Sequence, residues 1–310
     1  MGSGMQRVNR KERSVQHDHL VRTERIQAAS LVSPATLLLT IMFILPLLLF
    51  IRFSFNQFVP GEFMKTAWTL ENYIKFFSDP YYLRILLRTI TISVTSTVLA
   101  LILAFPVAHF LARLRKRWKS ILIIIIVFPL LLGNVVRAMG WIAVFSQAGL
   151  MNRLLLSSGA ISSPLQILQT PFAVTVVLAA VVMPYMILTL QAVIEKIQPD
   201  LEEAARDLGA SAWQVFRLVI LPLAMPGILA GTLLVFVLCM NAYATPLLIG
   251  GPKVLMMAPA LYSQIQEVSN WPLGGAMAVV LIGVTLLTSV VYSRILSRKY
   301  LRSVEGGTQV

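Results

Sequence analysis

Residues 172–194 read FAVTVVLAAVVMPYMILTLQAVI, and this stretch decides the fold class because it contains no charged side chain. A bilayer core needs about 20 mostly apolar residues per helix. Backbone groups in hydrocarbon must be hydrogen-bonded within their own segment, so an isolated stretch of this kind crosses the bilayer as a helix. We therefore predict a transmembrane helix over 172–194.

Five further stretches share this composition, and none of the six has an Asp or Glu in its interior. The long apolar runs lack the alternating pattern of an outer-membrane barrel. In the whole chain 57% of residues are hydrophobic and 13% are charged, against about 25% charged in soluble domains. The sequence predicts an all-α integral membrane protein with six transmembrane helices, over residues 31–55, 85–111, 121–145, 172–194, 223–249 and 273–292.

The basic residues indicate the orientation of these helices. The chain has 26 Lys and Arg against 13 Asp and Glu, a net charge of +13. The Lys and Arg residues gather in four segments: before the first apolar stretch, between the second and third, between the fourth and fifth, and after the sixth. By the positive-inside rule these segments are cytoplasmic. We therefore expect a cytoplasmic basic N-terminal tail over 1–30, a cytoplasmic C-terminal tail over 301–310, and contact with anionic membrane lipids.

Other classes of protein find little support. No folded basic module is present, so binding to nucleic acid is not expected. His17, His19 and His109 do not share a metal-ligand spacing, and Cys239 is the single cysteine. No Gly-rich phosphate loop is present either. We therefore expect no enzyme activity, no metal and no cofactor in this chain. Met1 to Gly4 resemble a cloning remnant, which makes Met5 the expected natural start.

The cytoplasmic link over 195–222 is more structured than a loop between two spans requires. Asp200 and Glu203 have capping-box spacing, so a helix is predicted to begin at Leu201. Gly209 is suited to a left-handed C-terminal cap that ends this helix. Ser211 and Gln214 repeat the capping-box spacing. They predict a second short helix running towards Pro222.

The first of these helices has an apolar face of Leu201, Ala204, Ala205 and Leu208, at spacings of three and four residues. The charged side chains of Glu202, Arg206 and Asp207 are predicted to lie on the other side. Two interpretations stay open at this point. The link is either a solvated connection whose helices pack on the bundle, or a helix–Gly–helix shape that docks a partner.

A family resemblance begins in this link. Glu203-Ala-Ala205, then Gly209, then Val219-Ile-Leu-Pro222 resemble the Glu-Ala-Ala signature of permease subunits of bacterial binding-protein-dependent ABC importers. The family usually has Ile where this chain has Val219. Arg137-Ala-Met-Gly-Trp141 and Asn241-Ala-Tyr-Ala-Thr-Pro246 resemble the spermidine/putrescine branch. That branch commonly has Gly-Asp/Glu-Phe/Tyr where this chain has Asn241-Ala-Tyr243. The likeness covers roughly residues 31–300.

The resemblance implies the type I ABC importer permease (MetI-like) architecture, with a six-span permease domain over 31–300 and a coupling-helix segment over 195–222. It implies a bacterial inner-membrane location, two ATPase subunits that hold ATP and Mg, a periplasmic solute-binding protein, and a second permease subunit that is related rather than identical. The implied solute is small, polar and polyamine-type. The ATPase-coupling residues would be Glu203, Ala204, Ala205, Asp207 and Gly209.

Arg137 is the main candidate for the pathway itself. An Arg inside an apolar span is costly and faces protein or water, so it either lines the pathway or makes a structural pair with a carbonyl or a partner subunit. A cation in mid-membrane would need a carboxylate or an aromatic cage, and the spans contain no carboxylate. Trp141 and Tyr243 are the aromatic candidates. The pathway candidates are Asn134, Arg137, Trp141, Asn241, Tyr243 and Thr245.

Alternatives to this interpretation remain. The solute could instead be an opine, an amino acid derivative or an oxyanion. A secondary transporter or channel would usually keep ionisable groups at the midplane of its spans, and a membrane sensor or scaffold would have no use for a coupling segment.

Overall fold

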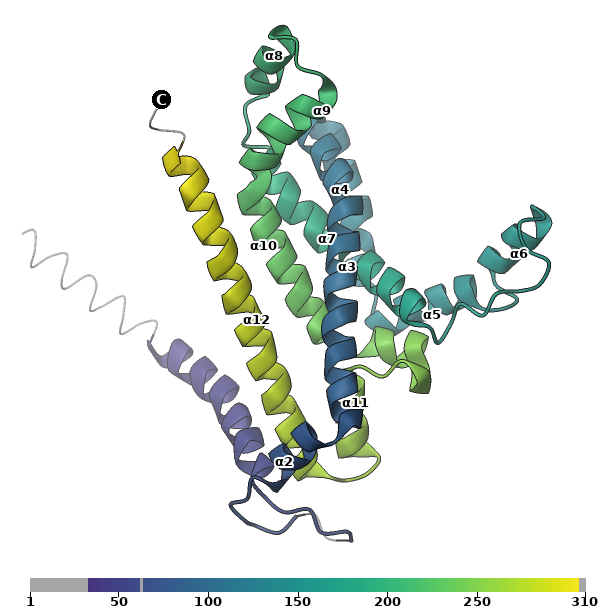
Figure 1. The fold of residues 1–310 in the computed structure, drawn as a ribbon, viewed down its shortest axis with the longest axis vertical. Helices are drawn as coiled ribbons and strands as arrows, with labels where there is room; N and C mark the ends of the chain where they lie inside the picture. The colour runs from purple at the N-terminus through teal and green to yellow at the C-terminus, as the bar shows by residue number, and fades with distance from the viewer. Residues whose placement is uncertain (1–32, 62–63, 307–310) are drawn as a thin grey trace, which may run out of the picture. The chain divides into compact units, whose positions relative to one another are not determined.

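The computed structural model describes residues 33–61 and 64–306, and it is helical over most of that length (Figure 1). The chain divides into two units, Met1–Phe53 and Ser54–Val310, which are treated separately below. The described part of the first unit is the apolar helix Ser33–Ser54, which agrees with the span predicted over 31–55. The predicted basic tail over 1–30 and residues 307–310 lie outside the described residues.

Within the described residues, five helices are long and apolar enough to cross a membrane, or six if one bent pair forms a single span. In the second unit these are α3 (Pro80–Arg113), α7 (Pro171–Ile194), the helix that ends in α10 (Leu221–Met240), and α12 (Trp271–Gly306). α3 and α12 extend beyond the predicted 85–111 and 273–292. α12 continues as helix to Gly306 and so includes most of the predicted cytoplasmic tail over 301–310, whose location stays a prediction.

The core of the second unit lies where α3, α7 and α10 run side by side (Figure 1). Ala100, Ala104 and Ala108 of α3 are fully buried in it. On α10, a Cβ at Gly231 would lie 2.9 Å from Met186 Sδ of α7. In lipid no hydrophobic force drives helices together, so small residues stabilise the bundle by allowing close approach.

The third predicted span is broken. Instead of one helix over 121–145, the chain forms α4 (Lys116–Leu131) and then α5 (Asn134–Phe145), which continues into α6 (Leu150–Ser157). The two halves meet at an angle of 98°. Leu132 and Gly133 between them are extended, with ψ of 140° and 147°. Pro129 lies in the last turn of α4, and proline weakens the helix on its N-terminal side.

The fifth predicted span, 223–249, ends early. α10 stops at Met240, and Asn241 leaves the helix with φ −99° and ψ 9°. The rest of the predicted span folds into a short π-helical turn, η2 (Pro246–Gly250), and a 3-10 turn, η3 (Gly251–Lys253). Pro246 lies at the start of η2, where its missing N–H costs nothing, and Gly251 has a φ of +52° that favours glycine.

Shorter helices connect the spans. α2 (Glu71–Ser78) and α11 (Met257–Gln266) were not predicted, and both pack against α12 or α3. The link between α7 and α10 contains α8 (Pro199–Asp207), α9 (Ala212–Val215) and the π-helical turn η1 (Phe216–Ile220). α8 and α9 lie at the end of the bundle where α3 ends and α4 begins (Figure 1).

Candidate functional site

The first helix of the coupling-helix segment begins two residues earlier than the predicted Leu201. α8 starts at Pro199, which occupies the first turn, and its N-cap residue Gln198 makes no side-chain cap hydrogen bond. The capping box expected between Asp200 and Glu203 is therefore wrong. Proline at the first helical position costs nothing because the first N–H groups of a helix have no partner within it, and its fixed φ suits the helix.

Gly209 ends α8 as predicted. Its φ is +84°, a conformation that an L side chain adopts at a cost. Gly209 N donates to Arg206 O at 2.8 Å and Ala210 N donates to Ala205 O at 3.1 Å. These two bonds form a Schellman motif, which satisfies carbonyls that the helix end would leave unpaired.

The apolar face of α8 points away from the bundle. Leu208 is 90% exposed and Leu201 is 45% exposed, and Ala204 is exposed between them. The buried residue of α8 is instead Glu202, at 7% exposure. The prediction that Glu202 would lie on the solvated side was wrong, because it forms an ion pair with Arg113 at the end of α3. α8 thus contacts the bundle through the Glu202 charge and through Ala205, which packs against the core, while Leu201, Ala204 and Leu208 stay exposed.

The predicted capping box of the second helix is confirmed. Ser211 Oγ accepts from Gln214 N at 3.4 Å and Gln214 Oε1 accepts from Ser211 N at 2.7 Å. The helix does not end before Pro222, however. α9, η1 and α10 run on as one helix from Ala212 to Met240, because the i→i−5 bonding of η1 accommodates the missing N–H of Pro222. Trp213 and Leu218 on this helix are also exposed, at 65% and 69%.

A cavity of about 370 Å³ brings together five of the six predicted pathway residues. α5 contributes Asn134 and Arg137, and the segment after α10 contributes Asn241, Tyr243 and Thr245. The breaks in the third and fifth spans make this possible. Each break replaces regular helix with a turn that places polar side chains beside α7, in keeping with the rule that irregular backbone in a membrane lines a cavity.

Arg137 is the one charged residue that lines this cavity or the cavity next to it. Its guanidinium donates to Asn134 Oδ1 and, at 3.5 Å, to the carbonyl of Val181 on α7. Its Nε is buried without a hydrogen-bond partner among the described residues. Both interpretations of Arg137 therefore have support in the geometry, since it pairs with a carbonyl and also lines the cavity.

Trp141 lines the second cavity, of about 330 Å³, together with Pro129, Gly140 and Pro184. Arg137 and Val181 line both cavities, so the two adjoin. Trp141 is thus separated from Tyr243, and the structure does not assemble these two rings into one aromatic cage.

Tyr185 is a cavity residue that the sequence did not single out. It follows Pro184 in the middle of the apolar stretch of α7, and a polar aromatic at that place is the signal that could have found it. A second ring, Tyr262 of α11, lies 4.9 Å from Tyr243 between ring centroids.

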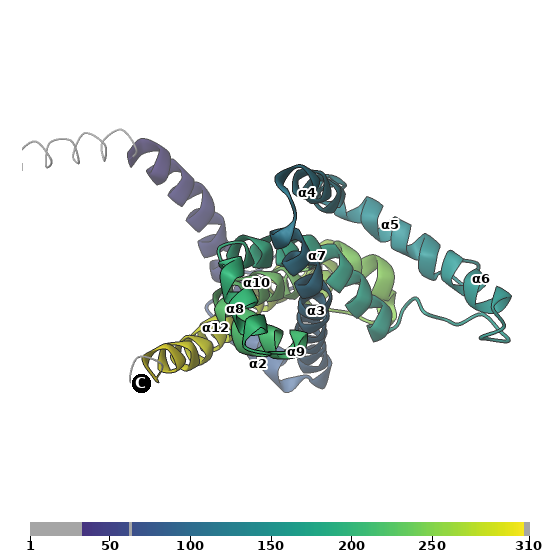
Figure 2. The same cartoon turned by 90° about the horizontal axis from the view of Figure 1, so that it is seen from above.

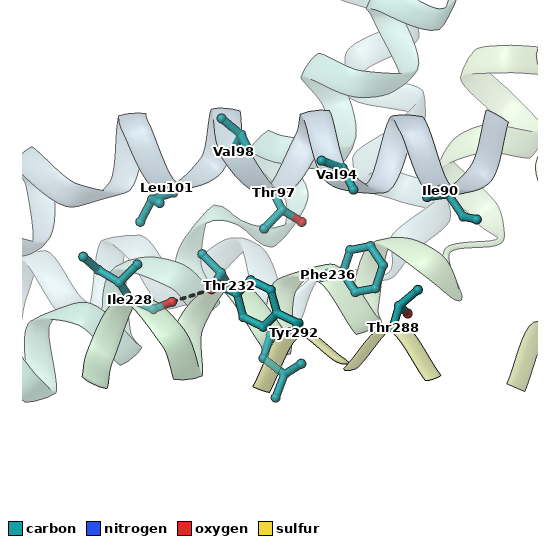
Figure 3. A pocket seen from close by; sticks show the side chains of 11 residues that line it. Ile90, Val94, Thr97, Val98, Leu101, Ile228, Thr232, Phe236, Thr288 and Tyr292 are labelled. Atoms are coloured by element: carbon teal, nitrogen blue, oxygen red, sulfur yellow. Dashed lines mark hydrogen bonds between the residues drawn. The ribbon is translucent and has the colours of Figure 1, made fainter. Parts of the chain in front are cut away.

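A third cavity is apolar and differs in character. It has a volume of about 340 Å³ and lies between α3, α10 and α12 (Figure 3). Its few hydroxyls are engaged, since Thr232 and Tyr292 are hydrogen-bonded to each other and Thr97 donates to Ser93 O at 2.7 Å. Nearby on α3, Ser96 Oγ links α3 to α7, since it donates to Thr175 O at 3.1 Å.

Comparisons with known proteins identify the family of this chain. Residues 85–302 match the family described as "Binding-protein-dependent transport system inner membrane component". The chain belongs to this family. The resemblance that begins at Glu203 is thereby confirmed, and the protein is a permease subunit of an ABC importer.

Curated relatives of this permease cover most of its length. The "Spermidine/putrescine transport system permease protein PotB" of Escherichia coli (strain K12) is 36% identical over 264 residues, which are 84% of this chain and 96% of that protein. The protein of the same description from Haemophilus influenzae is 34% identical over 83% of this chain and 90% of its own. A more distant relative, the "Inner membrane ABC transporter permease protein YdcU" of Escherichia coli (strain K12), is 32% identical over 68% of this chain and 71% of its own.

Solved structures show the same fold. A chain of a bacterial ABC transporter involved in the import of the acidic polysaccharide alginate superposes with a TM-score of 0.71, covering 93% of this permease and 99% of that chain. Its sequence identity is 16%, so the likeness is one of fold. The predicted class, a helical ABC importer permease of the MetI-like kind, is confirmed.

Proposed function

We propose that this permease forms half of the translocation pathway of an ATP-driven importer for a polyamine such as spermidine or putrescine. In this proposal a periplasmic solute-binding protein delivers the polyamine, a second, related permease completes the pathway, and two ATPase subunits with ATP and Mg supply the energy. The protein spans the bacterial inner membrane with both termini in the cytoplasm, as the distribution of basic residues favours.

The exposed apolar face of α8 carries the energy-coupling part of the proposal. Leu201, Ala204 and Leu208 present apolar surface to the cytoplasm, and an exposed apolar patch rimmed by charges is typical of a docking surface. Glu203 and Asp207 supply that rim, and both are exposed. Gly209 fixes the angle at which the chain leaves this surface. These residues would seat against an ATPase subunit.

The solute class rests on the relatives and agrees with the cavity. The spermidine/putrescine permeases are 34% to 36% identical over more than four fifths of this chain. The cavity beside α7 has the rings of Tyr185 and Tyr243 among its lining residues, and aromatic faces attract cations. A cavity without a carboxylate holds such a cation weakly, which suits a pathway that receives its solute from a selective receptor.

One observation favours a different solute class. Arg137 lines both pathway cavities as their one charged residue, and a guanidinium suits a carboxylate or an oxyanion. A molybdenum permease of Mycobacterium bovis, ModB, is also a relative, 31% identical over 54% of this chain. The alternative solute is therefore an oxyanion or a carboxylate-bearing molecule, such as an opine or an amino acid derivative.

Uptake into proteoliposomes tests the proposal. The permease is reconstituted with its co-encoded second permease and ATPases. ATP is sealed inside the vesicles, so that only complexes whose ATPases face the lumen are energised, and the solute-binding protein is added outside. We expect ATP-dependent uptake of labelled putrescine or spermidine, and none of molybdate or an opine. Uptake of an anion alone would leave the importer in place and replace the polyamine. Uptake that persists when the ATPases are omitted would overturn the importer mechanism.

A further inference from the structure

The contacts at the two ends of α3 point to a role that its apolar middle does not suggest. α3 is 34 residues long, which at 1.5 Å per residue is about 50 Å. It lies in the core beside α7 and α10. Each of its ends is hydrogen-bonded to a segment that the proposed function uses.

The cytoplasmic end of α3 holds the coupling segment. Arg113, the last residue of α3, forms an ion pair with Glu202 of α8 and donates to the carbonyl of Ile197 at 2.9 Å. Glu202 is 7% exposed. The Arg113 guanidinium thus contacts both α8 and the short segment that leads into α8 from α7.

A second ion pair joins α4 to the end of α7. Lys119, in the first turn of α4, pairs with Glu195, the residue that follows α7. Glu195 also accepts from Gln191 Nε2. The basic loop between the second and third spans was interpreted as an orientation signal, and Arg113 and Lys119 in it have this further use.

The outer end of α3 holds the segment that follows the cavity. Arg88 Nη1 donates to the carbonyl of Lys253 at 2.9 Å, and Thr89 Oγ1 accepts from Met257 N at 2.8 Å. Thr89 is fully buried. These contacts fix the chain directly after η2 and η3, the turns into which the cavity residues Asn241 to Thr245 lead.

We propose that α3 transmits the movement of the coupling helix α8 to the cavity segment over 241–257, through the Arg113–Glu202 ion pair at one end and through Arg88 and Thr89 at the other. This rests on the proposed function, since it needs an ATPase to move α8. A buried ion pair contributes little net stability compared with apolar residues of the same size. In this proposal the ion pair holds α8 at the end of α3, so that a movement of α8 also moves α3.

The double variant Arg113→Met with Glu202→Met separates transmission from stability. Replacing both partners leaves no unpaired buried charge, so the complex should assemble in normal yield. We expect it to dock its ATPases and hydrolyse ATP, while solute imported per ATP falls at least about tenfold. Thr89→Val, which keeps the shape of the side chain and removes its acceptor oxygen, should give the same separation in milder form. Arg117→Gln, at an exposed position in the first turn of α4, is the control and should transport normally.

The outcomes are distinguishable. If the wild-type complex hydrolyses ATP in response to the loaded receptor but imports nothing, the proposed function fails. If the wild type imports solute and the Arg113/Glu202 double variant imports the same amount per ATP, the proposed role of α3 fails and the ion pair only positions α8.

Discussion

At the scale of single residues, Arg137 combines a structural contact with a place in the cavity. It is held by Asn134 and by the carbonyl of Val181, and its Nε stays buried without a partner among the described residues. A buried, incompletely satisfied guanidinium costs free energy, and such a cost is typical of a group that function retains. Arg137 thus combines this cost with a place in the lining of both cavities.

Replacing Arg137 should therefore affect transport more than assembly. We expect Arg137→Ala to lower ATP-driven uptake by roughly tenfold or more, since a hydrogen bond to a charged group contributes about 1.5–3 kcal/mol. Arg137→Lys keeps the charge but loses the planar guanidinium that reaches two acceptors. Its uptake should therefore lie between that of the wild type and that of Arg137→Ala. The measurement is uptake normalised to the yield of the purified complex. Unchanged uptake at normal yield in the Ala variant would reduce Arg137 to a packing residue.

Gly209 provides a test of the coupling surface. A Cβ at this position meets nothing within 4 Å, so the first atom of a side chain fits there, and the left-handed backbone costs a non-glycine residue about 1–2 kcal/mol of strain. We expect Gly209→Trp to leave the permease folded but to abolish ATP-driven uptake, because the indole occupies the surface that meets the ATPase. Gly209→Asn, which tolerates the left-handed conformation, should keep most activity. Wild-type uptake in the Trp variant would exclude docking at this surface.

At the scale of elements, the breaks in the third and fifth spans form the cavity. The 98° bend between α4 and α5 turns α5 so that Asn134 and Arg137 reach α7. The end of α10 at Met240 frees Asn241 and Tyr243 from the helix. Two uninterrupted helices in these places would present the same residues elsewhere.

The bend can be tested by removing its cause. Gly133 has a φ of −58° and open space at its Cβ position, so Gly133→Ala alone should be tolerated. Pro129→Ala with Gly133→Ala restores a helix N–H and raises helix propensity by about 1 kcal/mol at the glycine and about 3 at the proline. We expect the pair to straighten α4 and α5 and lower uptake. Spin labels at Ser120 and Ser146, in a chain with Cys239→Ala, would report a longer distance; an unchanged distance would mean that packing, not these residues, sets the bend.

Local patterns predicted some of these elements and missed others for physical reasons. Gly209 and the Ser211–Gln214 box were found because a cap depends on residues a few positions apart. The burial of Glu202 was missed because it depends on Arg113, far away in the sequence. The bend at Leu132 and Gly133 was missed because both residues are compatible with an apolar helix. Tyr185 was missed because a single hydroxyl in the middle of a span has no periodicity.

At the scale of the whole molecule, the charges and the two sites imply one orientation. The exposed apolar residues of α8 (Leu201, Ala204 and Leu208) and the ion pairs of Arg113 and Lys119 lie at one end of the bundle (Figure 1). α11 and the contact of Arg88 lie towards the other end; Figure 2 shows the bundle from above. The α8 end would face the cytoplasm. The cavity lies along α7 between these ends.

Cysteine labelling tests this orientation. Cys239 is fully buried, so a Cys239→Ala chain gives a background without accessible thiols. Cysteines at Arg153 and Lys253 should react with an impermeant maleimide added to intact spheroplasts, and cysteines at Arg117 and Arg206 should react only after the membrane is opened; all four positions are exposed. The reverse pattern would invert the topology.

The proposed import mechanism requires that an ATPase subunit docks on α8. Photo-crosslinking from benzoylphenylalanine placed at Leu208, in a complex shown to import solute, measures it directly. Leu286 of α12, also exposed at 60%, is the matched control position within a span. We expect an adduct with the ATPase subunit from position 208 and none from position 286. An importing complex that gives no ATPase adduct from position 208, from Leu201 or from Trp213 would show that the ATPase does not act on α8.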